Sequence, residues 1–214
     1  MDKQEIYLPV KFILEGGYGE IIEKKSKFIA NVASVETVEQ ATEFIDNIKK
    51  KYWDARHNCS AFVLGDHNEV TRCSDDGEPS GTAGRPMLEV LLGAEVHNTV
   101  VVVTRYFGGV LLGTGGLVRA YTKAAQVGLA NSKIATRVYG SEVLLEADYN
   151  NIGKIQYILG KYGITDYQSE FTDRVKLTAF LRQEKKEEIL KEITQATAAR
   201  CKMVETKSEY RLLE

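Results

Sequence analysis

The spacing of apolar residues changes several times along the first half of the chain, and each spacing predicts a kind of element. Residues 27–35 alternate between apolar and polar, which indicates a strand. Residues 37–53 instead carry apolar side chains three and four positions apart, as an amphipathic helix does. Thr37 followed by Gln40 fits the residue pair that caps a helix start. Further strands are predicted at residues 59–64, 69–74 and 99–105, and helices from Pro86 onward and over residues 117–129.

The strand at residues 99–105 differs from the others because valine dominates it. A continuous apolar run of this length predicts a central strand that is covered on both faces. The two strands before it, at 59–64 and 69–74, are separated by a polar turn and should form a hairpin.

The predicted elements after Asn131 come in the order strand, helix, strand, strand, helix, strand. This order is typical of a ferredoxin-like sandwich, and about 75 residues are enough for such a domain. We therefore predict an α+β protein of two domains, with residues 1–133 in the first and residues 134–214 in the second.

Composition restricts the class of protein more than its function. The 214 residues are 43% hydrophobic and 27% charged, and the formal net charge of -2 gives no overall attraction to nucleic acid or to a membrane. No apolar run approaches the roughly 20 residues that cross a bilayer, and the first residues lack the apolar core of a signal peptide. The three cysteines form no CxxC pair, which favours a reducing compartment. We expect a cytoplasmic protein without a membrane partner, and the oligomeric state stays open.

Charge is distributed unevenly, however. Residues 96–141 contain no Asp or Glu, although the average acidity of the chain would place about six there. The same window holds Arg105, Arg119 and Lys123. A locally positive surface is one interpretation, and the burial of an apolar strand is the other.

A glycine-rich stretch at residues 108–116 precedes the predicted helix at 117–129. Backbone N–H groups at a helix start attract anions, and glycine lets a phosphate approach closely. Arg105 and Arg119 flank the stretch and could bind phosphate through two hydrogen bonds each. The glycines could equally serve tight turns and helix packing. The spacing matches no nucleotide-binding motif, so no cofactor is predicted. The candidate residues for binding an anion or nucleic acid are Arg56, His57, Arg85, Arg105, Tyr106, Gly108, Gly109, Gly113, Gly115, Gly116 and Arg119.

Three acids, Asp75, Asp76 and Glu78, lie in a turn-rich segment before the helix at Pro86. They are weak candidates for acid–base catalysis or for metal binding. They could instead accept backbone hydrogen bonds in turns or pair with Arg72 and Arg85. Since no HExxH or GxSxG motif is present, we predict no metal site and favour a non-enzymatic protein.

Three blocks of sequence together resemble a known family. They are ARHNCSAF at 55–62, SDDGEPSGTAGRPML at 74–88 and VVVVTRYFGGVLLG at 100–113. In this order they are similar to the Impact family, and in particular to its bacterial YigZ-like members. The resemblance extends over the whole chain.

The resemblance implies a fold and suggests partners. The first domain should contain a βαβ unit like that of a small-subunit ribosomal protein, and the second should be ferredoxin-like, similar to a domain of elongation factor G. Eukaryotic relatives regulate translation. We therefore expect a cytoplasmic binding module for RNA, the ribosome or a translation factor, with a role in translation regulation. An enzyme acting on a phosphorylated small molecule and a protein-interaction adaptor are the alternatives.

Overall fold

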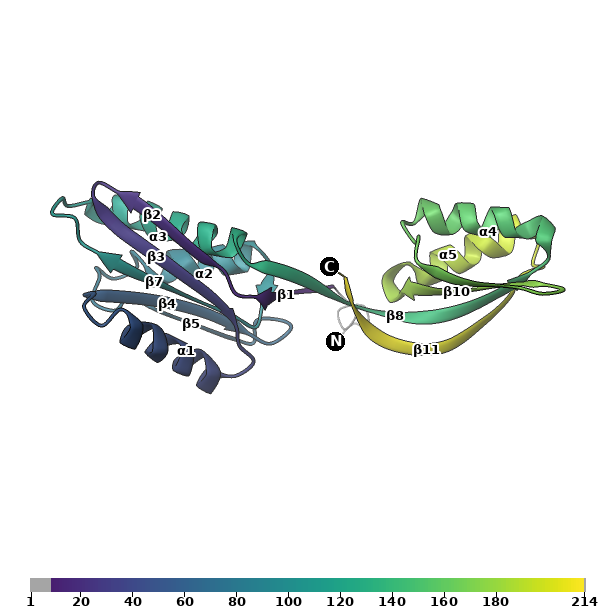
Figure 1. The fold of residues 1–214 in the computed structure, drawn as a ribbon, viewed down its shortest axis with the longest axis horizontal. Coiled ribbons are helices and arrows are strands. Elements are labelled where there is room, and N and C mark those ends of the chain that lie inside the picture. The colour runs from purple at the N-terminus through teal and green to yellow at the C-terminus, as the bar shows by residue number, and fades with distance from the viewer. Residues whose placement is uncertain (1–8, 214) are drawn as a thin grey trace. The chain divides into compact units, whose positions relative to one another are not determined.

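The computed structural model describes residues 9–213 of the chain (Figure 1). These residues form two compact units, Val10–Thr136 and Arg137–Leu213. The predicted division between residues 133 and 134 falls within strand β8, Lys133–Ala147. The prediction of a two-domain α+β protein is confirmed.

The first unit is built on a sheet of five strands in the order β2-β3-β7-β4-β5, with each strand antiparallel to its neighbours. Strands β3 and β4 both run antiparallel to β7, so they are parallel to each other, and helix α1 joins them as a βαβ unit. The predicted β4–β5 hairpin is present. The bounds are β2 Tyr18–Glu23, β3 Ser26–Ser34, α1 Val38–Lys51, β4 His57–Leu64, β5 Val70–Ser74 and β7 Thr99–Tyr106.

Strand β7 is central and buried on both faces, as its valines predict. Val101 and Val103 pack with helices α2 (Gly84–Gly93) and α3 (Gly113–Ala130), whereas Val100 and Val102 pack with α1 on the other face. Figure 1 shows α1 on one side of the sheet and α2 with α3 on the other. The alternation of side chains along a strand thus fills both layers of core at once.

Three strands of the first unit were not predicted. Strand β1, Val10–Glu15, pairs in parallel with the two-residue β6, Val96–His97. Strand β2 carries Gly19 at its inward position, where a Cβ would lie 2.6 Å from the backbone nitrogen of Gly128 in α3. Because the glycine replaces an inward apolar side chain, the alternation that marks a strand is absent from the sequence of β2.

The second unit has the strand order β11-β8-β10-β9 and two helices, which is the ferredoxin-like arrangement predicted. Every second residue of β8 and β10, for example Leu145 and Leu177, packs in one core with Ile155 of α4 and Ile193 of α5. The bounds are α4 Tyr149–Lys161, β9 Tyr167–Phe171, β10 Val175–Arg182, α5 Gln183–Ala196 and β11 Lys202–Leu213.

The strand register brings the three sequence blocks to one end of the first unit. His57, the first residue of β4, lies opposite Arg105 near the end of β7, and Ser74 at the end of β5 lies opposite Ser60. Lys27 near the start of β3 lies opposite Tyr106. The connecting segments 24–25, 52–56, 75–83 and 107–112 therefore meet at this end, toward which the β7 arrow points in Figure 1. We call it the loop end.

Candidate functional site at the loop end

Asp75 holds the start of helix α2. Its Oδ2 accepts a hydrogen bond from the backbone N–H of Gly81 at 2.8 Å, and its Oδ1 accepts from Ala83 at 3.0 Å and Gly84 at 2.9 Å. Burial acts to raise the pKa of Asp75, but these three hydrogen bonds outweigh it and the pKa is lowered. The N-cap residue of α2, Ala83, makes no side-chain hydrogen bond to the helix. Asp75 therefore replaces an ordinary N-cap.

Asp76 connects the same segment to α1 and β4. One carboxylate oxygen accepts from Lys49 Nζ at 2.8 Å, and the other accepts from the backbone N–H of Asn58 at 2.8 Å. The backbone of Asp76 is left-handed, with φ of 42°, and its carbonyl oxygen lies 2.9 Å from Nδ1 of His57. His57 is thus a contact of this turn, and only partly exposed.

Glu78 and Arg105 form a buried ion pair. Arg105 Nη1 lies 2.7 Å from Glu78 Oε1, with side-chain exposures of 8% and 3%. The Tyr121 hydroxyl donates to the same oxygen at 2.8 Å. The guanidinium lies 5.5 Å from the ring centres of Phe28 and Phe107. Arg105 follows Val103 on the face that packs on α2 and α3, so its charge is compensated inside the domain, contrary to its predicted place on the surface.

Cys59 completes this buried cluster. Its Sγ donates to the carbonyl oxygen of Asp75 at 2.9 Å and lies 3.3 Å from the Tyr121 hydroxyl. Burial raises the pKa of Cys59 to about 12 and raises that of Tyr121 even more. Both groups are therefore neutral at physiological pH.

The three acidic candidates thus have structural partners. Within residues 9–213, no group of three or more His, Cys, Asp and Glu side chains is arranged to hold a metal ion. The interpretation of these acids as acceptors in turns describes Asp75 and Asp76. The predicted pairing with Arg72 and Arg85 is wrong, because Glu78 pairs with Arg105 and Arg85 pairs with Glu89.

The glycine-rich stretch is partly loop and partly helix. Gly108 and Gly109 lie in the loop after β7, whereas Gly113, Gly115 and Gly116 form the first turn of α3, which begins earlier than predicted. A Cβ at Gly108 would overlap the carbonyl group of Lys25, so this position requires glycine. Gly109 and Gly113 have φ of 84° and 71° in the turn that leads into the helix.

The start of α3 has no side-chain cap. The capping position has no side-chain hydrogen bond to the helix, and the first turn contains no acidic residue. The first backbone N–H groups of a helix have no partner within it and carry a partial positive charge. An anion at this position would satisfy both conditions.

Three basic side chains surround a hollow beside this helix start. Lys24 from the β2–β3 turn and Arg119 and Lys123 from α3 line a hollow with a volume of about 240 Å³. We call it the basic hollow. Among the described residues, none of the three forms an ion pair. The remaining lining residues are Ile21, Glu23, Leu112, Gly116 and Ala120.

Sequence reasoning found only part of this hollow. Arg119 and Gly116 were among the predicted residues, and Lys123 lies within residues 96–141, which contain no Asp or Glu. Lys24 was missed because it enters from the turn between β2 and β3, and β2 has no visible strand pattern. Only the pairing of β2 with β3 brings Lys24 toward α3.

The other predicted residues lie elsewhere at the loop end. Arg56 is exposed just before β4, and the Tyr106 hydroxyl donates to Asp54 at 2.7 Å. Arg85 is exposed on α2 and lies 3.0 Å from Glu89, four residues later. The structure therefore brings Arg119 together with the start of α3 but does not bring Arg85 or Arg105 into the same hollow.

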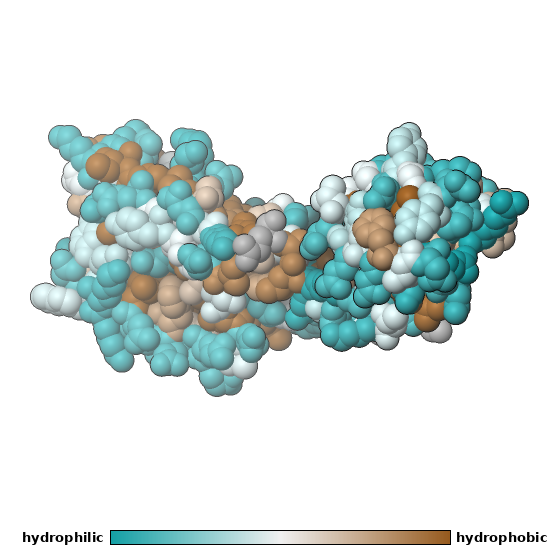
Figure 2. Space-filling view, turned by 45° about the vertical axis from the view of Figure 1, so that its right-hand side comes forward, coloured by the Kyte–Doolittle hydropathy of each residue, from teal (hydrophilic) through white to brown (hydrophobic). Residues whose placement is uncertain are grey.

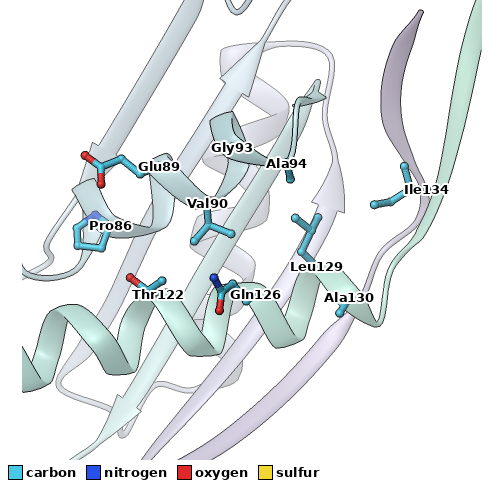
Figure 3. A pocket seen from close by; sticks show the side chains of 10 residues that line it. All are labelled: Pro86, Glu89, Val90, Gly93, Ala94, Thr122, Gln126, Leu129, Ala130 and Ile134. Carbon is cyan, nitrogen blue, oxygen red and sulfur yellow. The ribbon is translucent and has the colours of Figure 1, made fainter.

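A larger groove separates helices α2 and α3. Figure 3 shows its lining side chains, which include Val90, Leu129 and Ile134. Its volume is about 640 Å³, and Glu89 is the charged residue in its lining. The other lining residues are mainly apolar, and Glu89 pairs with Arg85. The groove therefore offers no site for an anion.

The second unit has a different surface. The face that Figure 2 shows is mostly hydrophilic, with hydrophobic residues scattered singly. Several charged groups on its sheet are paired, as in Arg211 Nη2 to Glu142 at 2.7 Å, and Arg174, next to β10, pairs with Glu146 at 3.3 Å. No described helix of either unit is long and apolar enough to cross a membrane.

Fold and site together define a two-domain α+β protein. A split βαβ domain carries the basic hollow, and a ferredoxin-like domain follows it in sequence. The model of the Impact N-terminal domain matches residues 24–129, and that of a domain of unknown function, DUF1949, matches residues 145–200. The chain belongs to the IMPACT family.

Named relatives cover most of the chain. IMPACT family member YvyE of Bacillus subtilis is 38% identical over 95% of this chain and 93% of its own length. IMPACT family member YigZ of Escherichia coli is 41% identical over 73% of this chain and 79% of its own. A crystal structure of a hypothetical protein covers 93% of this chain and 98% of its own, with 32% identity and a TM-score of 0.59.

Proposed function

We propose that the first domain is a non-enzymatic binding module that holds phosphate groups of RNA in the basic hollow. The observation that carries this proposal is that three acidic side chains at the loop end have partners inside the domain, whereas three basic side chains there have no such partner within residues 9–213. Asp75, Asp76 and Glu78 are engaged inside the domain. Lys24, Arg119 and Lys123 make no ion pair among the described residues and line a hollow beside the start of α3, which has no side-chain cap.

The size of the hollow supports a polymer in preference to a small-molecule substrate. Pockets that enclose a small molecule usually measure about 300–1,000 Å³, and the basic hollow measures about 240 Å³. Such a volume suits one phosphate group, while the rest of the partner extends along the surface. Phosphate contacts fix the position of a nucleic acid and carry no sequence preference by themselves.

The family resemblance extends the proposal to a physiological role. We propose that the partner is RNA, alone or within the ribosome or a complex with a translation factor, and that the protein acts in translation regulation in the cytoplasm. The engaged acids argue against the alternative of an enzyme, because general acid–base catalysis requires a carboxyl group that can reach the substrate.

A binding titration against salt tests the proposal. The variant Lys24→Ala/Arg119→Ala/Lys123→Ala should bind a single-stranded RNA more weakly than wild type. The slope of log affinity against log salt should fall by about 0.7 for each phosphate that the variant no longer neutralises. Arg85→Ala is the matched control, since it removes an exposed arginine that is already paired with Glu89. An unchanged salt slope in the triple variant would contradict the proposal.

A further inference from the structure

A group of aromatic side chains lies at the loop end on the α1 side of the sheet. Ile22, Lys27 and Tyr106 lie opposite one another on three adjacent strands, so they share one face. Tyr106 is on the same face as Val102, which packs against α1. Tyr18 lies four residues before Ile22 on β2 and points the same way, but it is further from the loop end, opposite Asn31 of β3. Tyr52 and Trp53 follow the end of α1.

Helix α1 covers this group only in part. Tyr52 packs against the core between α1 and the sheet, whereas Trp53, Ile22 and Tyr18 do not belong to that core. Trp53 is 82% exposed, Ile22 is 70% exposed and Tyr18 is about half exposed. Burial raises the pKa of Tyr18 to about 12, the hydrogen bond to Asp54 raises that of Tyr106 to about 12, and Tyr52 contributes to both shifts. We call Tyr18, Tyr52, Trp53 and Tyr106 the aromatic face.

Two of these rings are held in place by their hydroxyl groups. The Tyr18 hydroxyl donates to Glu20 at 2.9 Å, and the Tyr106 hydroxyl donates to Asp54 at 2.7 Å. Glu20 also pairs with Lys27 at 2.9 Å, so its charge is compensated. Fixed rings lose little conformational entropy when another flat group stacks on them.

Cations border the aromatic face. Lys51 lies over the Tyr52 ring with its Nζ 5.1 Å from the ring centre, and Arg56 is exposed three residues beyond Trp53. The basic hollow and the aromatic face lie on opposite sides of the sheet, because Ile21 lines the hollow beside α3 whereas Ile22 lies on the α1 side. Lys24 lines the hollow from the β2–β3 turn at the edge of the sheet, so a partner passes over this turn to reach both surfaces. A partner that fits both surfaces carries negative charge along its backbone and flat groups beside it.

We propose that the aromatic face stacks the unpaired bases of a single-stranded RNA whose phosphates occupy the basic hollow, an inference that rests on the proposed function. Aromatic side chains beside a cationic path are the usual means of binding single strands without sequence preference. The bases of a duplex are already stacked on one another and cannot reach such a face. The ligand class is therefore unpaired RNA, of at least several nucleotides, rather than a helix.

Trp53 provides a direct test because it is the only tryptophan of the chain. Its fluorescence is followed while full-length protein is titrated with an oligouridylate, with an RNA duplex and with inorganic polyphosphate. Oligouridylate should quench Trp53 with saturation, and the duplex and polyphosphate should not. Trp53→Ala should weaken oligouridylate binding by about tenfold, as loss of one stacked base predicts, whereas Trp53→Phe should stay close to wild type.

The matched control is Tyr157→Ala, which removes a tyrosine that is 74% exposed on α4 of the second unit. It should leave both affinity and quenching unchanged. Oligouridylate binding that depends on the basic hollow but leaves Trp53 emission and Trp53→Ala affinity unchanged overturns the base-stacking inference alone. Equal quenching by polyphosphate overturns it too. Absence of RNA binding by wild type overturns the proposed function and the inference with it.

Discussion

Replacing Arg105 with methionine should destabilise the first domain strongly, because this side chain belongs to a buried ion pair. The substitution leaves the Glu78 carboxylate, 3% exposed, with the Tyr121 hydroxyl as its remaining side-chain partner. Removing one member of a buried ion pair costs about 3–5 kcal/mol. Since a domain is stable by only about 5–15 kcal/mol, Arg105→Met should lower the free energy of unfolding by a large fraction of the total.

Arg85→Met is the matched control. Arg85 also forms an ion pair, but both side chains of this pair are more than half exposed, and an exposed pair at this spacing contributes about 0.3–0.5 kcal/mol. Urea denaturation of wild type and both variants, followed by circular dichroism, gives the two changes in unfolding free energy. The double variant Glu78→Gln/Arg105→Met should be more stable than Arg105→Met alone, because it leaves no unpaired charge buried.

The result that refutes this reasoning is specific. If Arg105→Met unfolds within about 1 kcal/mol of wild type, the expected cost of an unpaired buried carboxylate is absent. If the same variant also loses affinity for RNA, Arg105 contacts the partner directly and its predicted place on the binding surface is correct.

Three further outcomes can be measured on the same protein. Asp75→Ala should lose about 0.5–2 kcal/mol at neutral pH, as loss of a helix cap does. The difference from wild type should shrink as the pH falls below the ordinary carboxyl value of 3.8, because a carboxylate with a lowered pKa stabilises the fold only while it is ionised; a difference that persists in acid argues against the cap. A thiol reagent should modify the exposed Cys73 in the native protein and reach Cys59, whose pKa burial raises to about 12, only after unfolding; mass spectrometry locates the label, and rapid labelling of Cys59 contradicts the structure. Gly128→Ala should cost about 1–3 kcal/mol by overpacking, since its Cβ would lie 2.9 Å from a side chain of β3, and an unchanged melting temperature would show that α3 can move away.

The spacing of apolar residues predicted an element correctly where one type of side chain dominates a face of that element. The valines of β7 predicted a central strand, and the helical spacing after Thr37 predicted α1 together with its cap. In both cases burial follows directly from the period of apolar residues, so neighbouring residues carry the whole signal. Strand β2 was not predicted because Gly19 occupies its inward position, where α3 leaves no room for a side chain. The residue that limits this space is Gly128, 109 positions later in the sequence.

The candidate site was less predictable than the fold. Arg119 and the glycines of α3 were found because they are adjacent in sequence to one another. Lys24 was not found, and Arg105 was assigned to the surface, because the neighbours of each side chain come from distant strands and turns. A charge in a sequence has no assigned partner until the chain is folded.

The amino-acid sequence alone therefore determined the family, the two-domain α+β class, and most of the strands and helices. Tertiary structure decided which charges at the loop end are available to a partner. Glu78 neutralises Arg105 across 27 positions of sequence, and Asp75 is held by backbone groups up to nine residues away. Electrostatic pairing depends on distance in space and on exclusion of water, and neither is a property of local sequence.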